Sequence, residues 1–162
     1  MKTELDLSGV PTIPRSRVLL LKSKWHPAVI DGLSRGCCES LEQLGCMEVE
    51  QHTVPGSLEM PYAINFLIRS GRTYDAVICL GVILKGETLH SEMITREVYH
   101  GLSRLSIEQN IPIINEILPV IDIKHAEERA RDDKFNKGRE AAIAVAEIVA
   151  WRRLASSGNH KE

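Results

Sequence analysis

The chain has 162 residues, a formal net charge of −2 and an ordinary balance of apolar and charged residues. This length fits one domain with a buried core, and the lack of a lysine- or arginine-rich block argues against nucleic acid as a partner. The sequence contains no N-terminal signal stretch and no apolar run long enough to span a bilayer, so we expect no membrane association and a cytoplasmic location.

Four cysteines occur, at positions 37, 38, 46 and 79. None forms a Cys-x-x-Cys pair, and Cys79 lies within an apolar run. These features indicate small buried side chains in a reducing compartment rather than disulfides or a zinc site. The six histidines show no ligand spacing either, so no metal is expected.

Strand-like and helix-like segments alternate along the chain after an N-terminal arm. Residues 1–14 contain two prolines and little periodicity, which predicts an extended or partly disordered arm. The apolar run of residues 16–22 predicts a first strand, and residues 47–54 predict a second. Between them, residues 27–44 repeat apolar side chains at helical spacing, and Gly45 provides a helix C-cap.

The second half of the chain continues this alternation. A second helix follows the Pro55-Gly56 turn, with Ser57 as its candidate N-cap, and ends at Ser70-Gly71. The remaining predicted elements are strands at 76–84 and 111–118 and helices at about 91–109, 124–131 and 136–154.

Strands that are apolar throughout and alternate with helices are typical of a parallel sheet covered on both faces. The sequence therefore predicts an α/β protein with a three-layer α/β/α, flavodoxin-like domain and a four-stranded parallel sheet. We expect this domain to span residues 15–154 and to be followed by a flexible tail at 155–162.

The connection after the third predicted strand is the most informative segment. Gly86, Glu87 and Thr88 fall where free backbone N–H groups and the helix dipole can bind an anion. His90 follows immediately and is a candidate proton carrier. Active sites of open α/β folds lie at this end of the strands. Taken alone, the turn also fits a plain strand-to-helix connection, and His90 a surface or helix-capping residue.

Three other segments carry candidate site residues, each with a structural alternative. The loop at 54–59 offers N–H groups and Glu59 to a polyol or an amide-bearing ring, or is simply a helix start. Trp25 can stack on a flat heterocycle, or can edge the core. Arg129 and Arg131 can grip a phosphate, or belong to a solvated charged helix.

Four motifs follow one another in a specific order and spacing. They are Val-Pro-Gly-Ser-Leu-Glu-Met-Pro at 54–61, Tyr-Asp-Ala-Val-Ile at 74–78 followed by Gly81, Lys-Gly-Glu-Thr-x-His at 85–90, and Asn-Lys-Gly at 136–138. Together they resemble the 6,7-dimethyl-8-ribityllumazine synthase family of riboflavin biosynthesis. The similarity extends from about residue 16 to residue 151.

This resemblance implies a transferase that needs no cofactor. It would condense 5-amino-6-(D-ribitylamino)uracil with 3,4-dihydroxy-2-butanone 4-phosphate to 6,7-dimethyl-8-ribityllumazine and release phosphate. A catalytically weak paralogue that binds riboflavin or lumazine is the alternative.

The resemblance also implies a role for each site residue. His90 would shuttle protons, and a neighbouring subunit would add Arg129 or Arg131 to the phosphate-binding turn. The phosphate-binding residues would then be Gly86, Glu87, Thr88, Arg129 and Arg131, and the residues that bind the ring and its ribityl chain Trp25, Ser57, Leu58, Glu59, Val82, Ile83, Leu84 and Asn115.

The chain departs from the common family pattern at four positions. His26 stands where asparagine is frequent, Leu58 and Asn115 where phenylalanine is frequent, and Ser91 where an aromatic residue is usual. The family assembles as pentamers, some of which pack into 60-subunit shells. Because residues 131–135 lack the glycine of shell-forming members, we expect a free homopentamer.

Overall fold

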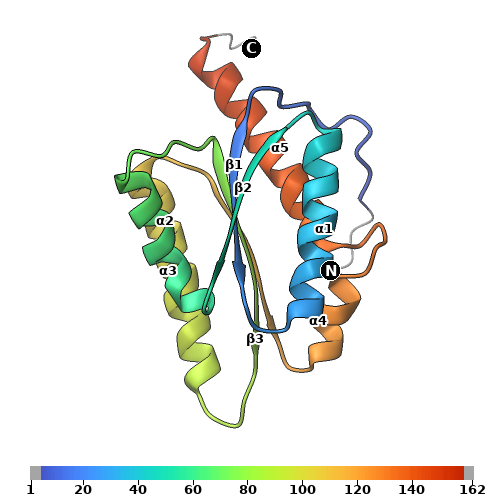
Figure 1. Cartoon of the computed structure of the whole chain (residues 1–162), viewed down its shortest axis with the longest axis vertical. Coiled ribbons are helices and arrows are strands. Elements are labelled where there is room, and N and C mark those ends of the chain that lie inside the picture. The colour runs from blue at the N-terminus through green and yellow to red at the C-terminus, as the bar shows by residue number, and fades with distance from the viewer. Residues whose placement is uncertain (1–4, 159–162) are drawn as a thin grey trace.

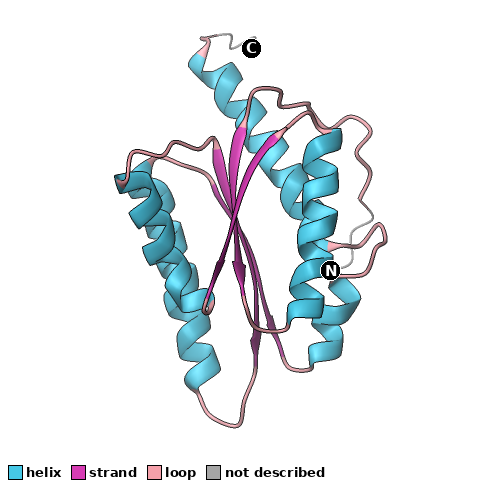
Figure 2. Cartoon of the chain, in the orientation of Figure 1, coloured by secondary structure: helices cyan, strands magenta, loops and turns pink. Residues whose placement is uncertain are grey.

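A computed structural model describes residues 5–158 of the chain, and it places a parallel sheet between two layers of helices (Figures 1 and 2). The four strands run in the order β2-β1-β3-β4. Their bounds are Arg17–Ser23 for β1, Glu48–Val54 for β2, Ala76–Leu84 for β3 and Ile113–Val120 for β4. The predicted three-layer, flavodoxin-like architecture is confirmed.

The helices divide between the two faces of the sheet (Figure 1). One face is covered by α1 (Pro27–Gln43), α4 (Ile123–Arg129) and α5 (Lys137–Ser156). The other is covered by the short 3-10 helix η1 (Ser57–Glu59), α2 (Met60–Arg69) and α3 (His90–Gln109). Successive residues of β1 enter opposite cores, Leu20 toward α1 and Leu21 toward α2. Burial on both faces explains why the central strands are apolar throughout.

Most element boundaries lie within two residues of their predicted positions, and β3 matches its predicted range. One of the two-residue differences is the start of β4, at Ile113 rather than Ile111. Asn110 is left-handed (φ 51°), and the N–H of Ile111 donates to the Ser106 carbonyl (3.0 Å). Ile111 therefore closes the last turn of α3 instead of opening the strand.

The described part of the N-terminal arm turns at residues 8–9 and is packed against the domain. The N–H of Leu5 donates to the carbonyl of Lys134 (3.0 Å), and that of Ile13 donates to the carbonyl of Leu44 (2.7 Å). The side chain of Ile13 is fully buried. The arm thus adds apolar contacts to the α1–α5 side of the core.

All four cysteines are free, and Cys37, Cys46 and Cys79 are buried, while Cys38 is half-buried. Burial raises the pKa of the Cys37 and Cys79 thiols, which disfavours the reactive thiolate. Within residues 5–158, no helix has the length and apolar character needed to cross a membrane.

One buried side chain, Asn136, joins three segments of the α1–α5 layer. As the N-cap of α5, its Oδ1 accepts hydrogen bonds from the N–H groups of Gly138 (2.8 Å) and Arg139 (3.2 Å). Its Nδ2 donates to the carbonyls of Arg131 (2.8 Å) and Gly32 (3.2 Å). Both acceptor sites and both donors of the amide are thus used, which allows the group to be buried with 1% exposure.

Glycines allow the backbones around this amide to approach closely. A Cβ at Gly36 would lie 2.5 Å from the Oδ1 of Asn136, and a Cβ at Gly138 would overlap the carbonyl oxygen of Leu33. In the Asn-x-Gly motif at 136–138, the asparagine therefore caps α5, and the glycine lets the backbone of α5 approach that of α1.

We expect Asn136→Ala to lower the free energy of unfolding by about 2–4 kcal/mol, because it removes the cap and leaves buried carbonyls without donors. Urea unfolding followed by circular dichroism measures the loss. Asp122→Ala is the matched control, since Asp122 caps the short helix α4 from an exposed position by accepting from the N–H of Lys124 (2.9 Å). Asp122→Ala should lower the free energy of unfolding by about 1 kcal/mol. Equal losses in the two variants would contradict the role of Asn136.

Candidate active site

Three loops meet at the carboxyl edge of the sheet. Trp25 follows β1, Gly56 follows β2 and Gly86 follows β3, each two residues after the strand ends. The first two loops are joined because the N–H of Lys24 donates to the carbonyl of Val54 (3.1 Å). This edge is where open α/β sheets bind their ligands.

A cavity of about 250 Å³ opens between the first two loops, the end of β3 and α3. Its lining consists of Trp25, Gly56, Ser57, Leu58, Glu59, Val82, Ile83 and Ile94. Six residues that the sequence predicted as ring- or ribityl-binding therefore lie around one space. Ile94, from α3, was not predicted, because its place in the helical apolar stripe indicated only a core residue.

Trp25 and Glu59 give this cavity its chemical character. The Trp25 side chain is 60% exposed. A Cβ added at Gly56 would lie 3.0 Å from Oε2 of Glu59 and 3.9 Å from Nε1 of Trp25, so both side chains border this glycine. An exposed indole beside a carboxylate suits a flat ring that carries N–H donors.

His26 fixes the direction of the chain directly after Trp25. It is the N-cap residue of α1 and adopts the left-handed conformation, with φ 57° and ψ 59°. Asparagine and histidine adopt this conformation more readily than most other residues that have a side chain. Histidine at position 26, in place of the asparagine that is frequent in the resembled family, thus keeps the bend that places Trp25 at the cavity.

Ser57 is buried against β3, with 7% exposure. The prediction that it caps a helix is wrong: Gly56 precedes η1, and no side-chain cap bond forms there. A Cβ at Gly81 would lie 2.5 Å from the Oγ of Ser57. The missing side chain at position 81 therefore lets η1 lie directly on the sheet.

We expect Gly81→Ala to destabilise the protein by about 1–3 kcal/mol, because the new methyl group would push Ser57 and η1 away from β3. The double variant Gly81→Ala/Ser57→Ala should regain most of that stability, since it removes the closest atom. Thermal unfolding measures both effects, with Ser57→Ala alone as the control. A double variant no more stable than Gly81→Ala would contradict this account.

The turn after β3 is open to solvent. Gly86, Glu87 and Thr88 are exposed, and among residues 5–158 no backbone carbonyl accepts from their N–H groups. The N-cap residue of α3, Leu89, provides no side-chain cap either. A Cβ at Gly86 would meet nothing within 4 Å. The turn thus combines free donors, a helix N-terminus and space for an anion.

His90 is the first residue of α3, one residue earlier than the predicted helix start. Its side chain is exposed, and its backbone N–H lies 3.4 Å from the Oγ1 of Thr88. Leu84, the last residue of β3, is also exposed, at 40%. Neither residue lines the cavity that contains Trp25.

A single chain does not bring the predicted arginines to this turn. Arg129 ends α4, and its Nη1 donates to the carbonyl of His125 (2.7 Å). Arg131 is exposed in the next loop. Both belong to the α1–α5 side of the sheet, whereas α3 begins on the other side (Figure 1).

Asn115 also lies away from the cavity within one chain. It pairs with Cys79 in the middle of β3, and its Oδ1 accepts from the N–H of Ile117 (3.0 Å).

The next residue in β4, Glu116, has a largely buried carboxyl group and was not among the predicted site residues. A single acidic residue within an apolar strand could have pointed to it. Burial raises the pKa of Glu116 to about 7; the carboxylate of Glu140 raises it further, and the ammonium of Lys137 opposes the shift.

The open parallel sheet, with a cavity and an uncapped helix N-terminus at its carboxyl edge, places the protein in the class of flavodoxin-like α/β proteins. Comparison with known proteins identifies the family within this class. The family model described as 6,7-dimethyl-8-ribityllumazine synthase matches residues 15–153.

Two relatives of that name come from different bacteria. The protein from Methylorubrum populi is 36% identical over 153 residues, which is 92% of this chain and 90% of the relative. The protein from Pectobacterium atrosepticum is 34% identical over 148 residues, 88% of this chain and 94% of the relative. The chain belongs to the 6,7-dimethyl-8-ribityllumazine synthase family, as its sequence motifs indicated.

Proposed function

We propose that the protein is a 6,7-dimethyl-8-ribityllumazine synthase. It condenses 5-amino-6-(D-ribitylamino)uracil with 3,4-dihydroxy-2-butanone 4-phosphate and releases inorganic phosphate. Besides family membership, the observation that supports this activity is the cavity that gathers Trp25, Ser57 and Glu59 beside the open turn after β3.

Different residues of the site bind the two substrates. The pyrimidine ring stacks on Trp25 and contacts the backbone of residues 82–84, and the ribityl chain binds Ser57, Leu58 and Glu59. The phosphate binds the N–H groups of residues 86–88.

In the reaction, the primary amine adds to the ketone carbonyl with loss of water to form an imine. A proton then leaves the adjacent hydroxyl-bearing carbon and phosphate leaves the next carbon, and the resulting enol tautomerises to a new carbonyl at the hydroxyl-bearing carbon. The secondary amine closes the ring on this new carbonyl, and a second water departs. Holding amine and ketone together can contribute about 7–11 kcal/mol to lowering the barrier. Proton transfer by His90 adds roughly 10²–10⁴-fold in rate.

We further propose that the working form is a homopentamer in which Arg129 of a neighbouring copy, or else its Arg131, reaches the phosphate, and Asn115 the ring. One chain leaves these residues away from the turn, and it exposes many large apolar side chains. The most exposed are Trp25, Met47, Tyr62, Leu89, Met93, Ile107, Ile121, Trp151 and Leu154. Apolar surface of this extent supports burial against other copies.

We also place the protein in the cytoplasm. Its four free cysteines support a reducing compartment.

We expect the purified protein, mixed with both substrates, to form a product with lumazine absorbance and fluorescence.

His90→Ala should lower turnover by about 10²–10⁴-fold while the pyrimidine substrate still binds, because the change removes a proton carrier and leaves the ring site intact. His100→Ala, an exposed histidine on the same helix, is the control and should retain full activity. Riboflavin binding by a wild-type protein without turnover would instead favour the binding paralogue.

Static light scattering tests the assembly. We expect a molar mass about five times that of the 18.1 kDa chain. A mass near that of one chain would contradict the shared site, and one about sixty times as large would show that the protein forms the shell.

A further inference from the structure

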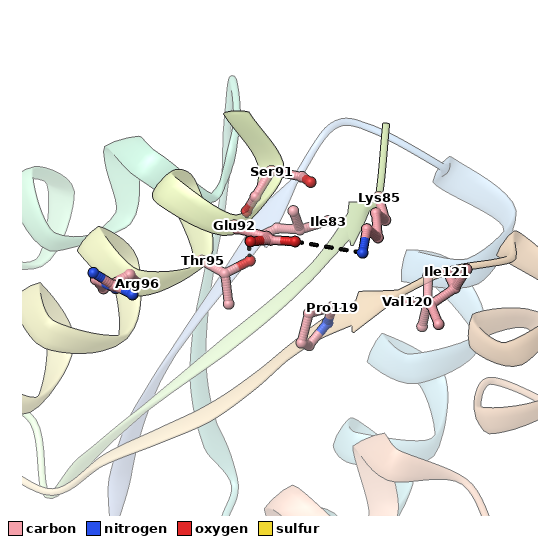
Figure 3. Close-up of a pocket in the computed structure, with 9 residues that line it drawn as sticks. All are labelled: Ile83, Lys85, Ser91, Glu92, Thr95, Arg96, Pro119, Val120 and Ile121. Carbon is pink, nitrogen blue, oxygen red and sulfur yellow. Dashed lines mark hydrogen bonds and ion pairs between the residues drawn. The ribbon is translucent and has the colours of Figure 1, made fainter. Parts of the chain in front are cut away.

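A second cavity, of about 310 Å³, lies beside the turn at 86–88 (Figure 3). Its lining combines polar side chains with aliphatic ones, which include Ile83 at the end of β3 and Pro119 and Val120 at the end of β4. Lys85 and Glu92 point toward one another across it, and the Nζ of Lys85 lies 3.4 Å from Oε1 of Glu92. Glu92 lies in the first turn of α3.

The backbone of Lys85 is fixed while its side chain remains free to move. Its N–H donates to the carbonyl of Val120 (2.8 Å), which anchors the residue directly before Gly86. The side chains of Lys85 and Glu92 are 53% and 57% exposed. An ion pair this exposed contributes little to stability, so moving the ammonium to another anion carries little cost. The open cavity leaves room for the lysine stem to change rotamer.

The negative charges around the turn favour a movement of the Lys85 ammonium toward a bound anion. Glu87 lies within the turn itself, and the carboxylate of Glu92 lies just beyond it. Both repel a phosphate dianion. Arg96 also lines the cavity, but its side chain points away from the pair (Figure 3). Lys85 is thus the cation best placed to offset these carboxylates.

Ser91 adds an unmet hydrogen bond at the same place. Its Oγ is buried, and within the described residues it has no hydrogen-bond partner. The residue lines the cavity next to Lys85 and Glu92. Buried hydroxyl groups normally have a hydrogen-bond partner, so this one leaves a place for a water or an ion beside the pair.

We propose that the Lys85–Glu92 pair is an exchangeable counter-ion of the phosphate subsite. Without ligand, Lys85 is held by Glu92. When a phosphate dianion occupies the turn, the ammonium leaves Glu92 and binds a phosphate oxygen. Glu92 thus competes with phosphate for Lys85 and sets how tightly the turn holds the dianion. This inference rests on the proposed function in placing the phosphate at residues 86–88.

Inorganic phosphate is the probe, and its dissociation constant is measured by isothermal titration calorimetry on the intact assembly. We expect Lys85→Met to weaken phosphate binding about tenfold, since it removes a charge-assisted hydrogen bond and keeps the apolar stem. Glu92→Gln should tighten binding several-fold, because Lys85 loses its competing partner. In the Lys85→Met background, Glu92→Gln should tighten binding less than it does in the wild type, because it then removes only the repulsion between the carboxylate and phosphate. Lys85→Arg should stay close to wild type.

Two controls separate this role from a general effect of charge. Glu108→Gln breaks the exposed Arg104–Glu108 pair (2.6 Å) at the far end of α3 and should leave phosphate binding unchanged. Arg96→Met should also have no effect. The inference is overturned if Lys85→Met binds phosphate like the wild type, if Glu92→Gln does not tighten binding, or if Arg96→Met weakens it instead.

Activity assays distinguish failure of this inference from failure of the proposed function. If the wild type forms lumazine while Lys85→Met keeps normal phosphate affinity, only the counter-ion role is wrong. If the wild type binds phosphate but forms no lumazine, the proposed function is wrong, and the phosphate titrations still decide the role of Lys85.

Discussion

The amide of Asn136 is the contact on which the α1–α5 layer depends. Its four hydrogen bonds set where α5 begins, hold the carbonyls of Gly32 and Arg131, and require glycines on the facing backbones. A fully satisfied buried amide is specific in a way that apolar packing is not, because few other geometries use all its donors and acceptors. This layer supports one face of β1 and β3, the strands that lead into Trp25 and into the turn at 86–88.

The cavity that contains Trp25 is shaped mainly by missing side chains and by one strained residue. Gly81 lets Ser57 lie on the sheet, and Gly56 leaves room between Glu59 and Trp25. His26 accepts a left-handed conformation that turns the chain after Trp25. Such positions cost stability and persist where the surrounding structure holds them, as is common at functional sites. The cavity is therefore built into the backbone before any ligand arrives.

Apolar runs and helical spacing were sufficient to predict the sheet, its helices and the gathering of Trp25, Ser57 and Glu59 at one edge. They failed where a tertiary contact decides a local choice. Ser57 resembles a helix cap, but its hydroxyl has a place against Gly81 that only the folded sheet creates. Ile111 resembles a strand residue, yet it completes the turn that ends α3. The Lys85–Glu92 pair also escaped prediction, because the spacing between strand end and helix start is set by the loop.

The charges at the edge of the sheet link the chemistry to assembly. Within one chain the turn at 86–88 has free N–H groups, two nearby carboxylates and the Lys85 side chain beside it. Arg129 instead donates to the carbonyl of His125 on the other side of the sheet. A helix N-terminus alone holds a dianion weakly in water, since its partial charge is small and solvent screens it. A second copy that covers Leu89 and Met93, which are exposed at the start of α3, would exclude water and strengthen each of these electrostatic contacts. On the proposed function, burial of exposed apolar surface and completion of the phosphate subsite are therefore the same event.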